Sequence, residues 1–305
     1  MIIISEITTK EMNSLLREIR RIESHRTAGT EYKVRKLYQE LLKDLKLFIS
    51  KEYELLGEDD RLTWEFLQRK QDYARFIEEV EWRINNILPK VSDEIINTVE
   101  SIYKFSYDSL VNAVEKNIGR IESLKLILSG LSGVSVEAVK RAVQNPIWGL
   151  TLDDTLNKHR NEILYNIKKE LNVGLINGDR YTTMARRVSQ SLNGDYKKSI
   201  RIVRTESHRN TVAGNLEAAL TIDRELRENE TGYRIFKTWI TMKDERVRPT
   251  KSTDKYDHRI LDGVSIPVDS FFISHDVETP APLQSGIAGF DINCRCELKF
   301  DIRKV

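Results

Sequence analysis

Apolar residues recur at helical spacing along most of the chain. Before residue 130 they mark successive faces at intervals of three and four residues, from Met12 to Ile22, from Tyr73 to Ile87 and from Val99 to Ile121. Gly and polar residues in HRTAGTE (25–31) and LLGEDD (55–60) predict breaks between helices, and Pro89 predicts another helix end. We therefore expect residues 1–150 to form an elongated helical bundle.

The pattern changes after Gly232. A short helix is predicted over about 135–144, and longer helical patterns follow up to that glycine. YRIFKTWIT (233–241) then alternates with period two, which predicts a strand, and GVSIPVDSFFI (263–273) and DINCRCELKFDI (291–302) predict two more. The sequence thus predicts an α+β protein, with a compact domain of helices packed on a small antiparallel sheet over residues 151–305.

Composition supports a globular protein without a membrane segment. Charged residues make up 31% of the 305 residues and hydrophobic residues 40%, and charges interrupt each apolar stretch well before the length of a membrane span. The net charge is +2, but residues 121–200 carry 12 basic and 8 acidic side chains. This basic segment is either a solvated surface or a contact with DNA through Lys158, Arg160, Lys168, Lys169, Arg186, Arg187, Lys197 and Lys198.

The only two cysteines, Cys294 and Cys296, are separated by one residue. On a strand they would share an apolar face with Ile292 and Leu298, as small core side chains. The alternatives are a structural zinc site completed by His258, perhaps with His275, and a redox pair. One intervening residue is fewer than the two to four that zinc ligand pairs usually have, and the three interpretations remain open.

One further stretch suggests specific contacts. In RTESHR (204–209), Arg204 and His208 share a helix face, and Glu206 can reach Arg209 or Asn210. Alternatively, Arg204 and Glu206 would lock the helix to the sheet by reaching one of four residues, Asp244, Arg246, Arg248 or Asp262.

Glycine and tryptophan positions add local expectations. Gly214 lies inside a predicted helix, which indicates a close backbone approach, and Gly263 in ILDG supplies the positive φ of a tight turn. The four tryptophans Trp64, Trp82, Trp148 and Trp239 are expected in the core.

Four segments in fixed order resemble a known family: YTTMARRVSQSL, RTESHRNTVAGN, WITMKDERVRPT followed by DHRILDG, and NCRC. They resemble the head morphogenesis domain named after the F protein of phage Mu, over roughly residues 150–302. The motif positions, for which a structural role is expected, are Arg204, Thr205, Glu206, Gly214, Trp239, Asp244, Arg246, Arg248, His258, Asp262, Gly263, Asn293, Cys294 and Cys296. In this family the histidine follows RVR closely, whereas nine residues separate Arg248 from His258 here.

The resemblance implies a minor capsid protein inside the head of a tailed bacteriophage, present in the host cytoplasm during assembly. Such a protein would dock on the portal and assist head assembly and DNA packaging or ejection. Scaffolding protein, major capsid protein and packaged double-stranded DNA are further expected partners. We expect no catalytic residues and no cofactor apart from the zinc alternative. Because the chain ends nine residues after Cys296, we expect no appended effector domain. The competing hypotheses are a DNA-binding module and an enzyme, nuclease or transferase-like, that uses His258 and Glu206.

Overall fold

The computed structural model describes residues 3–69, 72–118, 127–128, 130–131, 133–147, 149–251 and 253–305. The chain forms two compact units, each assembled from segments distant in sequence. The sheet unit comprises Met1–Thr27, Asn97–Leu152 and Arg204–Val305, and the helical unit comprises Ala28–Ile96 and Asp153–Val203. Both units include residues from either side of residue 150, so a domain boundary at that position stays a prediction.

The helical unit is built from parts of α1 (Ile3–Leu56), α3 (Tyr73–Ile118), α6 (Leu152–Asn177) and α7 (Tyr181–Glu228), with the short α2 (Trp64–Arg69). Side chains at helical spacing form its core, among them Val34, Leu41, Leu45, Phe76, Val80, Ile84, Ile163, Ile167, Leu171, Met184, Val188 and Leu192. The hydroxyl groups of Tyr38 and Ser199 share a buried hydrogen bond of 2.8 Å between α1 and α7. The helices expected before residue 150 are present, but in this unit they are combined with α6 and α7, which follow that residue.

Two predicted helix ends are wrong. Helix α1 continues through residues 25–31, and α3 continues through Pro89. A proline inside a helix costs about 3 kcal/mol. Apolar side chains remain buried on both sides of Pro89, including Ile84 and Val91, and their burial offsets that cost. The end predicted at LLGEDD is confirmed, because α1 ends at Leu56, directly before Gly57.

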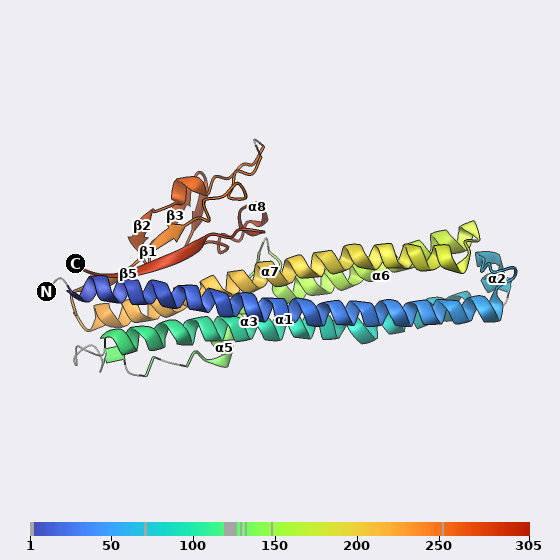
Figure 1. Cartoon of the computed structure of the whole chain (residues 1–305), viewed down its shortest axis with the longest axis horizontal. Helices are drawn as coiled ribbons and strands as arrows, with labels where there is room; N and C mark the ends of the chain where they lie inside the picture. The colour runs from blue at the N-terminus through green and yellow to red at the C-terminus, as the bar shows by residue number, and fades with distance from the viewer. Residues whose placement is uncertain are drawn as a thin grey trace. The chain divides into compact units, whose positions relative to one another are not determined.

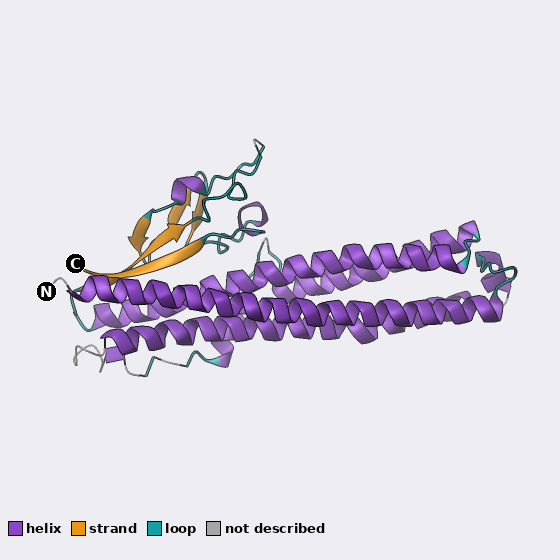
Figure 2. Ribbon diagram, in the orientation of Figure 1, coloured by secondary structure: helices purple, strands orange, loops and turns teal. Residues whose placement is uncertain are grey.

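The strands of the described residues lie in the C-terminal segment of the chain (Figures 1 and 2). One antiparallel sheet has the order β2-β1-β5, formed by β2 (Ser265–Pro267), β1 (Tyr233–Ile240) and β5 (Glu297–Lys304). Strands β3 (Phe272–Ser274) and β4 (Val277–Thr279) form a separate antiparallel pair. Helices α5 (Val136–Val143) and α8 (Ala288–Asp291) and a 3-10 turn at Arg259–Leu261 complete the sheet unit.

A single hydrophobic core joins this sheet to helices. Trp239 of β1 and Phe300 of β5 are buried in the same cluster as Leu110 of α3 and Val212 and Leu216 of α7. Helices therefore pack on a small antiparallel sheet, which confirms the predicted α+β class. Within the described residues, no helix combines the length and the apolar character needed to cross a membrane.

The core prediction for the tryptophans is right at one position and wrong at two. Trp239 is fully buried, whereas the exposed fractions of Trp64 and Trp82 are 40% and 61%. Trp148 lies outside the described residues. The guanidinium of Arg83 lies over the indole of Trp82, 5.6 Å from the ring centroid. This cation–π contact partly covers the exposed ring.

Gly214 marks a close approach of α7 to α3, as its position inside a helix predicts. A Cβ atom at this position would lie 2.5 Å from the carbonyl oxygen of Tyr103. Backbone atoms cannot move aside as a flexible side chain can, so only glycine fits the observed spacing.

We predict that Gly214→Ala lowers the free energy of unfolding by about 1–3 kcal/mol, because the added methyl group overpacks the contact with Tyr103. Gly194→Ala is the matched control in the same helix, since nothing lies within 4 Å of the position of its Cβ. That change should raise stability by up to about 1 kcal/mol through helix propensity. Urea unfolding of both variants measures the difference, and equal stability of the two would refute a backbone clash at Gly214.

A second prediction concerns pH and the buried His159. Burial, and next the positive charge of Lys198, lower the pKa of this imidazole from 6.5 to about 4. The folded state therefore holds it neutral, while the unfolded chain takes up a proton below pH 6.5. The contribution of His159 to stability is fully present above pH 6.5 and is lost as the pH falls toward 4. The loss reaches about 1.4 kcal/mol at pH 5.5.

Thermal unfolding between pH 7.5 and 5.5 tests this, with His159→Gln as the comparison. The variant has no imidazole to protonate, so its loss of stability over this range should be smaller by about that amount. Parallel pH profiles for the wild type and the variant would contradict the assignment.

Candidate functional site

Three of the motif segments meet within the sheet unit around one cleft of about 580 Å³. Helix α7, the loop after β1 and the segment before β5 contribute to it, together with one turn of α1. Its lining consists of Arg20, Glu23, Ser24, Arg204, Thr205, His208, Arg246, Arg248, Thr250, Asp254, Asn293, Cys294 and Arg295. Many of the predicted motif positions are in this lining, and Arg20 and Glu23 of α1 were missed because they look like an ordinary solvated helix face.

The cleft is rich in positive charge. Its lining holds five arginines against two carboxylates. Arg248 donates from both terminal nitrogens to the carbonyl oxygens of Phe290 and Ile292, at 2.9 and 2.6 Å. Arg295 donates to Asp244 at 2.5 Å, and this hydrogen bond is the main reason why the pKa of Asp244 lies below its usual value. Arg248 thus ties the loop after β1 to the segment before β5.

The RTESHR face of α7 contacts both the segment before β5 and α1. His208 Nε2 lies 3.1 Å from the carbonyl oxygen of Cys296, and its Nδ1 lies 3.5 Å from a carboxylate oxygen of Glu23. As predicted, Arg204 shares this face, since it lines the same cleft as His208. The imidazole therefore joins α1, α7 and the segment that leads into β5.

Glu206 is buried and pairs with Arg209, whose guanidinium nitrogen lies 3.1 Å from its carboxylate. Burial raises the pKa of Glu206, and the charge of Arg209 opposes that shift. Arg209 also donates to the carbonyl oxygen of Asn145. The prediction that Glu206 reaches Arg209 is confirmed, and the alternative in which it pairs with the loop after β1 is wrong.

Asp244 and Asp262, which were proposed as partners of Arg204 and Glu206, have other hydrogen-bond partners. Asp244 pairs with Arg295, and Asp262 accepts hydrogen bonds from the backbone nitrogen and the hydroxyl of Thr241, at 2.8 and 3.0 Å. The backbone hydrogen bond from Thr241 is the main cause that lowers the pKa of Asp262. The predicted turn is confirmed, because Gly263 has a φ of +81° and donates to the carbonyl oxygen of Trp239 at 2.8 Å.

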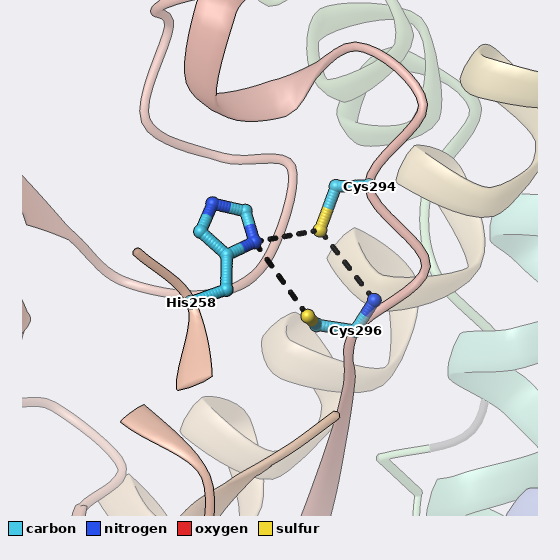
Figure 3. A group of neighbouring side chains, drawn as sticks. All are labelled: His258, Cys294 and Cys296. Atoms are coloured by element: carbon cyan, nitrogen blue, oxygen red, sulfur yellow. Dashed lines mark hydrogen bonds between the residues drawn. The ribbon is translucent and has the colours of Figure 1, made fainter. Parts of the chain in front are cut away.

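His258, Cys294 and Cys296 form a compact buried cluster (Figure 3). His258 Nδ1 lies 3.5 Å from Cys294 Sγ and 3.6 Å from Cys296 Sγ. The exposed fractions of the three residues are 1%, 6% and 2%. Nine residues separate Arg248 from His258 in the sequence. His258 nevertheless donates its backbone N–H to the carbonyl oxygen of Arg248 at 3.1 Å, so the two ends of this loop are held together.

Two expectations about the cysteines are not met: they do not lie on the last strand, and His275 does not join them. Both residues precede β5, which begins at Glu297, so they lie in the loop before the strand. Asn293 has a φ of +62°, and this left-handed residue turns the chain before the first cysteine. His275 is exposed and is not part of the cluster. The expected burial is confirmed, since both cysteines belong to the hydrophobic core of the sheet unit.

The two thiols are electrostatically inequivalent. The hydrogen bond with the Cys294 thiol, and next that with His258, lowers the pKa of Cys296 to about 5. The interaction with Cys296, followed by burial, raises the pKa of Cys294. The two cysteines therefore titrate as a pair, and the pKa of Cys296 is shifted in the opposite direction to that of Cys294.

The residues proposed for DNA contact lie in the helical unit, and several have acidic partners. Lys168 pairs with Glu81 and Lys198 pairs with Glu162. Arg187 pairs with Asp179 at 2.6 Å and with Glu170 at 3.4 Å. The side chains of Lys169, Arg186 and Lys197 are exposed. Paired cations are partly neutralised, so the basic surface is weaker than the sequence suggests, and DNA contact stays a prediction.

Comparison with known proteins identifies similar chains. The family model for Phage Mu protein F like protein matches residues 165–299. Minor head protein GP7 of Bacillus phage SPP1 is 28% identical over 273 residues, which cover 89% of this chain and 82% of that protein. Residues 165–299 thus carry a Mu F-like region, and the resemblance drawn from the sequence is confirmed.

An enzyme is also similar in part. The NAD(+)--arginine ADP-ribosyltransferase EFV of Enterococcus faecalis is 28% identical over 176 residues, 58% of this chain and 34% of that protein. The chain therefore spans about a third of the enzyme's length. No solved structure gives a significant match.

The Glu206–Arg209 pair generates a prediction. Arg209→Met should lower the free energy of unfolding by about 3 kcal/mol, because it leaves a buried carboxylate without its cation. Arg246→Met is the control, since the Arg246 side chain is 71% exposed and lies 3.7 Å from Asp244, and it should cost less than about 1 kcal/mol. Adding Glu206→Gln to Arg209→Met should restore part of the loss. Denaturant unfolding measures all three variants, and an equal effect of the two single changes would contradict the pairing.

Proposed function

We propose that the protein is a minor head protein of a tailed bacteriophage that takes part in head morphogenesis. The observation that carries this proposal is the extent of the similarity to the minor head protein of phage SPP1, which covers 89% of this chain and 82% of that protein. The similarity extends well beyond the Mu F-like region of residues 165–299. A shared role of the whole chain accounts for it better than one shared module does.

In the finer form of the proposal, the protein docks on the portal inside the head and assists assembly and DNA packaging or ejection. It would be present in the host cytoplasm until heads form. The cleft supports a docking role, because Arg204 and Arg246 are exposed in a lining with an excess of arginines. Such a recess suits acidic side chains of a protein partner, since complementary charge favours and orients association.

The enzyme hypothesis receives less support from the site. Glu206 is buried against Arg209, and His258 is buried against two cysteines, so each of the two proposed catalytic groups is withdrawn from solvent. The similarity to the ADP-ribosyltransferase covers only about a third of that enzyme. Similarity over that part does not transfer the enzyme's activity to this chain. We therefore propose a structural role without a chemical step.

The test combines portal binding with incorporation into heads. Tagged protein, produced in cells infected with a phage that lacks its own copy, should co-purify with the portal protein and be found in purified heads. The double variant Arg204→Glu with Arg246→Glu should reduce portal capture about tenfold by reversing charge in the cleft. Lys169→Glu with Lys197→Glu, equal in charge change but in the helical unit, is the matched control.

The outcomes separate the hypotheses. Absence from heads together with failure to bind the portal would overturn the proposal. If the control variant, and not the cleft variant, loses function and also weakens DNA binding in a salt-dependent manner, the DNA-binding alternative is favoured over portal docking.

A further inference from the structure

We propose that His258, Cys294 and Cys296 bind a zinc ion that clips the loop after β1 to the segment before β5. The ligands would be His258 Nδ1 and the two sulfur atoms. This inference concerns the residues of the cluster alone and does not rest on the proposed role in the phage head.

The spacing of the three ligand atoms fits one metal ion. Zinc bonds of about 2.0–2.1 Å to nitrogen and about 2.3 Å to sulfur, at tetrahedral angles, separate the two ligand atoms by about 3.6 Å. The distances from His258 Nδ1 to the sulfur atoms of Cys294 and Cys296 are 3.5 and 3.6 Å. All three ligand atoms lie within 4.8 Å of one another. The imidazole nitrogen therefore lies at the separation from each sulfur atom that a shared zinc ion requires.

Hydrogen bonding alone accounts for the cluster less well. In either tautomer Nδ1 carries one lone pair or one N–H, so it can make one strong hydrogen bond and not two. Both sulfur atoms nevertheless lie at nearly the same distance from it, and Figure 3 shows that both contacts converge on this one ring nitrogen. A metal ion accounts for the convergence, because it accepts an electron pair from each of the three atoms.

The chemical surroundings also suit zinc. Two thiolates neutralise a divalent cation, which removes the cost of keeping net charge in the hydrophobic core. The backbone N–H of Cys296 lies 3.4 Å from Cys294 Sγ and can donate to the thiolate. One imidazole and two thiolates select zinc over magnesium or calcium, which prefer oxygen ligands. On binding, any thiol proton passes to solvent.

Packing holds the histidine in place. The His258 ring lies 4.3 Å from the Phe290 ring and 5.7 Å from the Trp239 ring, measured between centroids. Its Nε2 atom is buried and has no hydrogen-bond partner within the described part of the chain. Aromatic rings thus take the orienting role that a carboxylate or carbonyl usually has for a histidine ligand. Coordination at Nδ1 would place the remaining ring proton on Nε2.

The fourth position of the ion would be filled by water from the cleft. Zinc is usually four-coordinate, and the cluster supplies three ligands. Cys294 lines the cleft, so the sulfur atom of this ligand connects the cluster to the solvent-accessible recess. His258 and Cys294 are 36 positions apart in sequence, and one ion would close that loop. Zinc would then stabilise the cleft from its inner side.

The experiment measures metal content and cobalt spectra of the full chain, purified under reducing conditions without chelator. We expect about one zinc per chain, and a sulfur-to-cobalt charge-transfer band when zinc is replaced by Co²⁺. Cys294→Ser and Cys296→Ser should each weaken metal binding at least about tenfold. His275→Gln, which changes an exposed histidine outside the cluster, should leave zinc content and the cobalt spectrum unchanged.

Two results would overturn the proposal. One is free thiols in the wild type with neither bound zinc nor a cobalt charge-transfer band. The other is an intact mass lower by two hydrogens with no free thiol, which would make the cysteines a disulfide and favour the redox interpretation. If either serine variant fails to fold, the cobalt titration of the wild type decides the question by itself.

Discussion

The burial of the Trp239 indole is the contact on which the C-terminal part of the site depends. The ring is fully buried, and the rings of His258, Phe272 and Phe290 pack around it at centroid distances of 5.7, 5.2 and 6.2 Å. The backbone of Trp239 bonds on one side to the turn at Gly263 and pairs on the other with Leu298 of β5. One residue thus sets the position of the turn, of the last strand and of the histidine that faces the cysteines.

Local sequence pattern predicts those elements whose determinants are local. Period-two alternation over residues 233–241 gives β1 almost to the residue, since a half-buried strand imposes that period directly. The same reasoning fails at Pro89, because the penalty of one proline is local while the burial that offsets it depends on partners far away in sequence. Trp64 and Trp82 fail for a related reason, since apolar periodicity does not show where a helix lacks a covering neighbour.

In the candidate site too, local sequence predicts some features, and others depend on residues far away in sequence. The turn at Gly263 and the close approach at Gly214 were predictable, because a glycine is favoured there mainly by a positive φ or by a neighbouring backbone that leaves no room for a Cβ atom. The meeting of His258 with the cysteines was only one of three alternatives that the sequence left open, since it requires a closed nine-residue loop and a left-handed Asn293, and sequence spacing specifies neither. Glu206 shows a third case, in which a partner three residues away prevails over more distant ones because little chain entropy is lost in reaching it.

Charge and burial together support the proposed binding role of the cleft over a catalytic one. Arg248 is engaged by two carbonyl oxygens and Arg295 by Asp244, so these cations hold the walls of the cleft in place. The groups that could transfer protons, Glu206 and His258, lie in the core behind those walls. A general acid or base must reach its substrate, whereas a docking surface needs only a fixed shape and complementary charge. In the role that we propose for the cleft, its motif residues meet the second requirement, and the buried groups of Glu206 and His258 help to keep its shape.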